Sequence, residues 1–238
     1  PAAGQLTQDD LKEITLELHE HIAALASDEF AGRAPASKGE ALTTAYIAKE
    51  FKALGLSPGN GDSYLQGVPV TESITDADTS LSVEGTGFEA EFHYGEEMVA
   101  SSEQQLESTA IEKSELVFVG YGIVAPERGW NDYAGIDVDG KTVIILVNDP
   151  GYATQDPSVF NGNAMTWYGR WPYKFEEAAR QGAAGAFIIH ETGAAAYGWD
   201  VVYSSWSSPQ VGLTAKNRNV DKSKVVGWLS QQSARQLF

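Results

Sequence analysis

The sequence predicts an α+β fold, with a helical pair at the N-terminus followed by a β-rich domain. Over the first 55 residues, apolar side chains recur every three or four positions, which is the period of a helix. From about residue 64, apolar and polar residues alternate, as in a half-buried strand. Beyond residue 115, short continuous apolar runs are typical of strands buried on both faces. We therefore expect a helical segment over residues 1–63 and a β-rich domain over residues 64–238.

The first helix is predicted to begin after Thr7, because Asp10 lies three residues on and can complete a capping box. Its apolar stripe consists of Leu11, Ile14, Leu18, Ile22 and Leu25. A polar loop over residues 27–35 separates it from the second helix.

The second helix is predicted to begin after Ser37, with Glu40 at its third position, and to end at Gly55 in a left-handed conformation. Its side chains expected to point inward are Ile47, Phe51 and Leu54.

The alternating region predicts a strand over residues 64–70, interrupted by Pro69, and a hairpin over residues 81–92 around Gly85-Thr86-Gly87. Residues 101–115 are polar and predict a surface connection. The continuous apolar runs predict strands over residues 116–119, 142–147, 186–190 and 225–229.

A helix from Tyr173 to Gln181 is predicted between two of these strands, with Pro172 in its first turn and Gly182 at its end. Together they make a βαβ-like unit. Ser230 is expected to cap a last helix that runs to Phe238. Because the sequence starts at Pro1 and stops inside that helix, we expect it to be a trimmed piece of a longer chain.

Composition excludes several classes of function. The chain has no cysteine, so it can form neither a disulfide framework nor a site that depends on cysteine ligands. A net charge of −17 argues against binding to nucleic acid or to an anionic membrane surface. No apolar run reaches the length of about 18 residues that a membrane span needs.

The negative charge is concentrated in residues 1–110, which hold 20 acidic and 5 basic residues, against 13 and 11 in the remainder. An acidic, solvated face explains this pattern. A cation-binding cluster is the alternative, although the carboxylates between residues 76 and 97 lack the spacing and the fixed glycine of a calcium loop.

Catalytic motifs are missing from the sequence. Its four histidines are His19, His21, His93 and His190, and no HExxH or His-x-Asp motif contains them. There is no GxSxG motif, and residues 204–208 predict a polar loop. His190 lies at the end of a predicted strand, where it serves either as a polar cap or as a base. We therefore assign no catalytic and no metal-ligating residue.

Residues 161–171 form the most unusual loop, because arginine and aromatic side chains are close together in it. Such residues are enriched at recognition surfaces, but they also fold back on one another. Its members of interest are Met165, Trp167, Tyr168, Arg170 and Trp171.

Two sets of phrases resemble a known family. Residues 25–33, Gly39-Glu40 and residues 51–56 are similar to the N-terminal segment of exported bacterial zinc aminopeptidases, relatives of aminopeptidase Y, glutamate carboxypeptidase and the transferrin receptor. The second set resembles the protease-associated (PA) domain inserted in that family. It consists of residues 118–123, residues 130–133, Asp139-Gly140-Lys141 and residues 174–183. The resemblance covers nearly the whole chain.

The resemblance implies a PA domain built as a β-sandwich or open barrel with flanking helices. It also implies two zinc ions in a catalytic lobe, with ligands and a general base that match no position here. This chain would then be the non-catalytic portion of a periplasmic or secreted peptidase, inactive alone, with the catalytic lobe and a peptide as its partners.

In such relatives the PA domain covers the active-site cleft, which makes Tyr168, Arg170 and Trp171 candidates for facing the substrate. Arg170 could bind a peptide carboxylate through its two-pronged guanidinium, and Tyr168 or Trp171 could pack on a side chain. The alternative is a stand-alone PA-type module that binds protein or peptide without catalysis.

Overall fold

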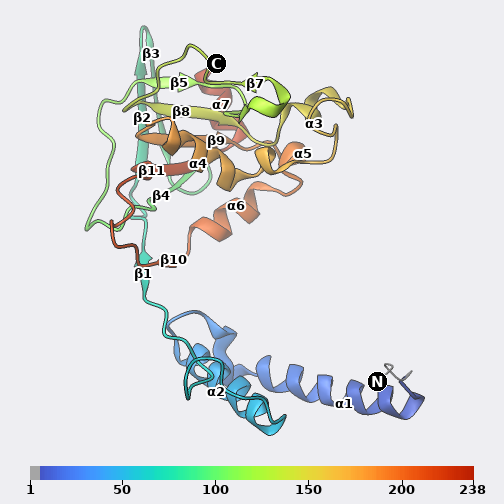
Figure 1. Cartoon of the computed structure of the whole chain (residues 1–238). Coiled ribbons are helices and arrows are strands. Elements are labelled where there is room, and N and C mark those ends of the chain that lie inside the picture. Colours follow the sequence, from blue (N-terminus) through green and yellow to red (C-terminus); the bar gives the residue numbers. More distant parts are fainter. Residues whose placement is uncertain (1–5) are drawn as a thin grey trace. The chain divides into compact units, whose positions relative to one another are not determined.

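A computed structural model describes residues 6–238 of the chain. The described residues form two compact units, one up to residue 68 and one over residues 69–238, and each is described by itself (Figure 1). Helices dominate the first unit and mixed sheets the second, so the α+β class predicted from the sequence is confirmed.

The first unit consists of two helices and a short turn between them: α1 (Gln8–Leu25), the 3-10 helix η1 (Asp28–Arg33) and α2 (Lys38–Ala53). The predicted caps are confirmed. Thr7 and Asp10 form the capping box of α1, and the Ser37 hydroxyl accepts the Glu40 N–H at the start of α2. Gly39 allows α2 to pack closely against η1, because a Cβ at this position would lie 2.2 Å from the Phe30 carbonyl oxygen.

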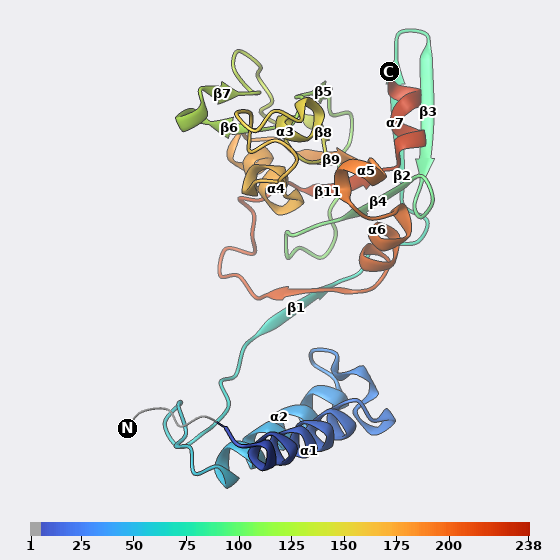
Figure 2. The ribbon, with the colours of Figure 1, turned by 90° about the vertical axis from the view of Figure 1, so that its right-hand side faces the viewer.

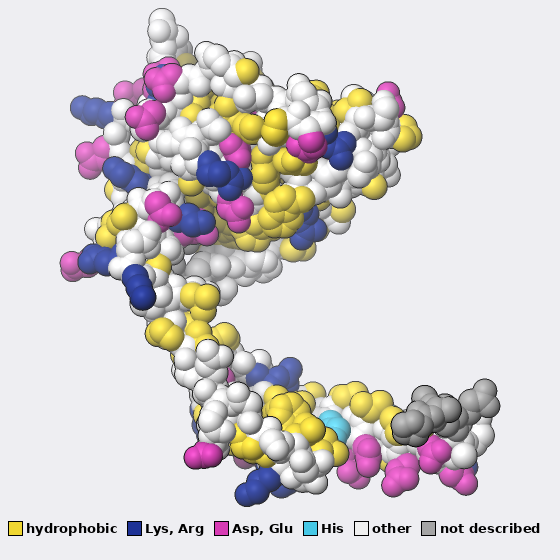
Figure 3. All heavy atoms as spheres, in the orientation of Figure 1, with side chains coloured by type: hydrophobic (Ala, Val, Ile, Leu, Met, Phe, Trp, Pro, Cys, Tyr) yellow, Lys and Arg dark blue, Asp and Glu magenta, His cyan; other side chains and the backbone are white. Residues whose placement is uncertain are grey.

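The side chains predicted to face inward in this unit are instead exposed. Helix α1 has no buried residue, and Ile47, Phe51 and Leu54 of the second helical segment are exposed as well. In Figure 3 apolar side chains follow one side of α1 and carboxylates the other. Two short helices enclose too little volume to bury both stripes, which explains why the inward prediction was wrong.

The second unit is built on a five-stranded sheet. In spatial order its strands are β4 (Met98–Ser101), β11 (Val225–Leu229), β9 (Gly185–Ile189), β8 (Thr142–Leu146) and β5 (Leu116–Phe118). Only β4 is antiparallel to its neighbour. The apolar runs are therefore strands, and β8 and β9 are buried along almost their whole length, as the sequence predicts.

Helices cover one face of this sheet and a hairpin covers the other (Figure 2). On the first face lie α4 (Trp171–Arg180) and α6 (Trp199–Trp206), packed on a core that includes Val143, Ile145, Ile188 and Trp228. On the second lie β2 (Ser80–Gly85), β3 (Phe88–His93) and α7 (Gln231–Leu237), packed on Met98, Ile144, Phe187 and Leu229.

This layered sheet differs from the β-sandwich or open barrel expected for the domain. Parallel neighbours such as β8 and β9 need a crossover connection, and α4 supplies it on one face. The second β layer is reduced to the β2–β3 hairpin.

Short elements complete the unit. They are β6 (Val124–Ala125), η2 (Pro126–Arg128), β7 (Trp130–Asn131), α3 (Pro150–Thr154), η3 (Trp167–Gly169) and α5 (Thr192–Ala195). In addition β1 (Val70–Ser73) pairs antiparallel with β10 (Gln210–Leu213). The strand predicted over residues 64–70 is wrong except for Val70, and the predicted polar loop at Ser204 begins inside α6.

Candidate functional site

Helix α4 positions three groups of side chains around the second unit. Side chains four residues apart share one face of a helix, so Trp171 lies above Phe175 and Tyr173 above Glu177. Lys174 projects between these two pairs and is fully buried. Pro172 occupies the first turn and Gly182, at φ +82°, follows its end, as predicted.

The first group borders a hollow of about 960 Å³ that lies wholly within the second unit. Trp171, Phe175 and Trp206 pack edge to face there, with ring centroids 5.9 to 6.3 Å apart. Trp171 is 41% exposed and Phe175 only 4%, so the cluster is anchored in the core and open on one side. The β1–β10 ladder and residues 100–109 form the opposite walls.

The charged side chains that line this hollow are mostly acidic. They are Glu72, Asp76, Glu103 and Glu107, against the single ammonium of Lys222. The four acidic residues are exposed to solvent, and Lys222 is half-buried. The excess of carboxylates gives the hollow a negative potential, which attracts cationic groups.

The structure separates the three residues predicted to face a substrate. Trp171 lines the hollow. Arg170 is exposed at the N-cap position of α4, where its carbonyl accepts the Lys174 N–H at 3.4 Å. Tyr168 belongs to another cluster, because it packs on Tyr173 with ring centroids 5.0 Å apart and donates its hydroxyl to Glu127 Oε1 at 2.8 Å.

Sequence reasoning missed two members of the aromatic cluster, Phe175 and Trp206. Phe175 was placed in a predicted helix, but nothing in the local sequence joins it to Trp206, which lies 31 positions further on in a helix that was not predicted. The i, i+4 spacing of Trp171 and Phe175 was the one available signal.

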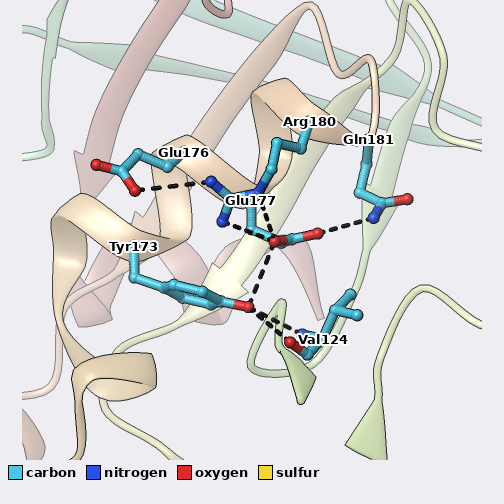
Figure 4. A network of polar contacts seen from close by, with 6 residues as sticks. All are labelled: Val124, Tyr173, Glu176, Glu177, Arg180 and Gln181. Atoms are coloured by element: carbon cyan, nitrogen blue, oxygen red, sulfur yellow. Dashed lines mark hydrogen bonds and ion pairs between the residues drawn. The ribbon is translucent and has the colours of Figure 1, made fainter. Parts of the chain in front are cut away.

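The second group ties α4 to the strand β6 (Figure 4). The Tyr173 hydroxyl accepts the Val124 N–H at 3.0 Å and lies 3.2 Å from the Val124 carbonyl oxygen. The buried Glu177 carboxylate accepts bonds from Arg180 Nη2 at 2.8 Å and from Gln181 Nε2 at 2.8 Å.

Burial raises the pKa of Tyr173 to about 12, which keeps its hydroxyl protonated at neutral pH. A protonated phenol is not a general base. The bonds of this network tie α4 to β6.

The third group is Lys174 and its surroundings. Its Nζ donates to the carbonyl oxygens of Tyr121 at 2.5 Å and Asn148 at 2.7 Å, which follow strands β5 and β8. Burial lowers the pKa of Lys174 to about 7, and the carboxylates of Asp132 and Asp149 oppose that shift. Lys174 thereby joins the ends of two neighbouring strands.

Asp149 is a second buried charge near these strand ends. Its carboxylate accepts the Gly151 N–H at 3.1 Å and both the N–H and the hydroxyl of Thr166, at 2.9 and 2.7 Å. These bonds tie β8 to the loop that leads into α4. All of them are internal to the protein, so Asp149 supports the loop that carries Trp171.

Two of the histidines have hydrogen-bond partners within the protein. His190 is buried, with Nε2 3.1 Å from the Tyr197 carbonyl oxygen, and burial lowers its pKa. His21 Nδ1 lies 2.7 Å from the Tyr46 hydroxyl of α2. Within residues 6–238, no three His, Asp or Glu side chains are placed to hold a metal ion. In the same residues, no helix is both long and apolar enough to cross a membrane.

Comparisons with known proteins give one structural similarity. No protein-family model matches the sequence, and no curated protein matches it. Among solved structures, the aminopeptidase from Aneurinibacillus sp. strain AM-1 is similar over 90% of this chain, with 20% sequence identity and a TM-score of 0.38. The chain spans 39% of the length of that aminopeptidase.

Proposed function

We propose that this chain is the non-catalytic N-terminal and PA portion of an exported two-zinc aminopeptidase, and that its larger unit helps to bind the peptide substrate. The sequence phrases that resemble the PA domain support this proposal, because they contact one another in the fold. The phrase over residues 174–183 forms most of α4, and its Lys174 binds the carbonyl of Tyr121 in the phrase over residues 118–123.

The observation that carries the proposal is the hollow beside α4. Its volume of about 960 Å³ is in the range of ligand sites, and it combines aromatic side chains with exposed backbone of a two-stranded ladder. Aromatic rings and strand edges are what a protein uses to hold an extended peptide. Of the residues predicted to face substrate, the proposal keeps Trp171 and the neighbouring Arg170.

Zinc belongs to the proposed full-length protein and not to this chain. The described residues do not fit a zinc site, since His21 is bound to Tyr46 and His190 is enclosed by aromatic rings. We therefore derive no step of hydrolysis from these side chains. The catalytic lobe, the two zinc ions and a periplasmic or secreted location remain parts of the proposal.

The gene downstream of the Phe238 codon tests this function. We expect an open frame that encodes a His-x-Asp segment and a Glu-Glu pair. The protein expressed from that longer frame should release p-nitroaniline from leucine p-nitroanilide, lose the activity to a chelator and regain it with zinc. A downstream segment without these motifs, or a long protein without this activity, would refute the proposal.

A stand-alone peptide-binding module is the second candidate function. One observation favours it: the residues that line the hollow all lie between Thr71 and Val226, so no other domain is needed to form the hollow. A stop codon directly after Phe238, together with peptide binding by the 238-residue chain, would support this candidate over the first.

A further inference from the structure

Strand β10 has an outer edge that β1 does not use. The Thr214 N–H donates to the Pro69 carbonyl at 3.0 Å, which makes these two residues a hydrogen-bonded pair. In an antiparallel ladder such pairs alternate with non-bonded ones, so Val211 and Leu213, opposite Glu72 and Val70, are non-bonded. Their N–H and C=O groups therefore point away from β1.

Part of this edge is already paired with a side chain that imitates a strand. The Gln105 amide donates through Nε2 to the Leu213 carbonyl at 2.7 Å and accepts the Ala215 N–H through Oε1 at 2.8 Å. One residue of a neighbouring strand makes the same two kinds of bond, through its own N–H and C=O. The edge can therefore pair with the backbone of another strand. Val211 lies two residues before Leu213 on the same edge, and its side chain is 42% exposed.

The hollow beside this edge has a definite chemical character. Its carboxylates Glu72, Asp76, Glu103 and Glu107 outnumber the single ammonium of Lys222. Apolar surface lies among them, on Val211, Leu106 and Trp171. A ligand with alternating basic and apolar side chains complements both properties, because successive side chains of a strand point to opposite sides.

We infer that the outer edge of β10 at Val211 binds an extended peptide that carries lysine or arginine, by adding it as a strand. The inference rests on the proposed function, since it names the substrate chemistry of the same site. Backbone bonds to Val211 supply the binding mode, and the carboxylates of the hollow select the positive charge.

Three synthetic hexapeptides test the inference on the 238-residue chain by isothermal titration calorimetry. The first alternates valine and lysine, the second alternates valine and glutamate, and the third is the lysine peptide with N-methylated valines. We expect binding of the first, and dissociation constants at least tenfold higher for the other two. No binding of the lysine peptide, or equal binding of all three, would overturn the inference.

Variants of the protein test the same contacts from the other side. Val211→Pro removes an N–H that points away from β1, and an edge strand tolerates proline at such a position. We expect at least fivefold weaker binding of the lysine peptide. Unchanged binding by a variant whose circular dichroism matches the wild type would refute strand addition.

Charge selection has a matched control. Glu103→Gln with Glu107→Gln removes two carboxylates that line the hollow, and Glu89→Gln with Glu91→Gln removes two from β3, outside it. We expect the first double variant to bind the lysine peptide three- to tenfold more weakly and the second to stay within twofold. Equal weakening by both would refute selection by the hollow.

The two hypotheses can fail separately. A gene without downstream metal-binding motifs would refute the peptidase proposal, but it would not change the outcome of the peptide titrations. Titrations without binding would refute strand addition at β10, but they would not change what the downstream gene encodes.

Discussion

At the scale of single residues, Lys174 is a fully buried amine within the second unit. It is buried without a carboxylate in direct contact, and two backbone carbonyls receive its ammonium group. Those carbonyls follow β5 and β8, so one side chain joins the segments that leave two neighbouring strands. Trp171 and Phe175, which line the hollow, lie on the same helix as Lys174.

Replacing Lys174 by methionine should destabilise the protein by about 2–4 kcal/mol. Methionine keeps the apolar stem but leaves the carbonyls of Tyr121 and Asn148 without a donor, and each buried unpaired group costs about 1–3 kcal/mol. Chemical denaturation measures the loss. Lys216→Met, at an exposed position, is the control and should stay within about 0.5 kcal/mol. An equal effect of both would contradict this role.

The same lysine predicts a pH dependence of stability. Burial lowers the pKa of Lys174 in the folded protein to about 7, whereas an unfolded chain restores the ordinary value of about 10.4. Between these values the unfolded state holds the proton and the native state has lost it, so raising the pH stabilises the native state. The free energy of unfolding of the wild type, relative to Lys174→Met, should therefore rise from pH 7 to 10, by at most about 1.4 kcal/mol per unit. A difference independent of pH would contradict the lowered pKa.

Arg170 gives a prediction for the proposed full-length peptidase. Arg170 is exposed and precedes Trp171 at the start of α4, and under the proposal it binds substrate without taking part in the chemistry. Arg170→Ala should raise KM about two- to tenfold and leave kcat unchanged, which is the signature of lost uniform binding. Arg235→Ala, on α7, is the control. Unchanged KM and kcat in both variants would contradict a role of Arg170 in substrate binding.

At the scale of elements, caps and glycine stops were the reliable sequence signals. Thr7, Ser37 and Ser230 each accept the N–H three residues on, at the predicted starts of α1, α2 and α7. Strand β11 has the predicted bounds. The caps depend on neighbours within a few residues, and the continuous apolar run of β11 is itself a local signal, which is why a sequence alone can place them.

Elements without a continuous apolar run or a capping residue were missed or misplaced. Residues 64–68 alternate like a strand, but they form no ladder in the structure, whereas β10 is a strand because β1 lies beside it. The members of the candidate site could not all be predicted, for the same reason. Trp171 was identified, but its grouping with Trp206 and with the β10 edge is a property of the tertiary fold.

Gly182, which follows the end of α4, gives a testable prediction about stability. Gly182 has φ +82°, and a Cβ there would lie 2.6 Å from Asp139 Oδ1, across the turn that precedes β8. Gly182→Ala should cost about 1–3 kcal/mol of stability, because both the backbone angle and the contact become unfavourable. Gly212→Ala is the matched control in the same unit, since its φ is ordinary and no atom lies within 4 Å of its added Cβ. Equal melting temperatures of the two variants would contradict this account.

At the scale of the whole molecule, the two units differ in how they are stabilised. Among the described residues of the first unit only Phe30 and Gly39 are buried, whereas the second unit has a continuous core on both faces of its sheet. Burial of apolar surface is the main favourable term in folding, so the first unit gains little from its own contacts. Its exposed stripes on α1 and α2 agree with the proposal that these helices belong to a larger lobe.

This difference predicts where a protease cuts first. Residues 54–69 have no helix or strand and only Tyr64 among them is partly buried, so their backbone can enter a protease without unfolding a core. Brief chymotrypsin treatment should cleave after Leu56, Tyr64 or Leu65 and leave a resistant fragment that ends at Phe238, which mass spectrometry identifies. Lys174→Met should lose that resistant fragment sooner than the wild type, because the core behind the fragment is weaker. First cuts between Leu116 and Leu229 in the wild type would instead mean that the second unit opens as easily as the first.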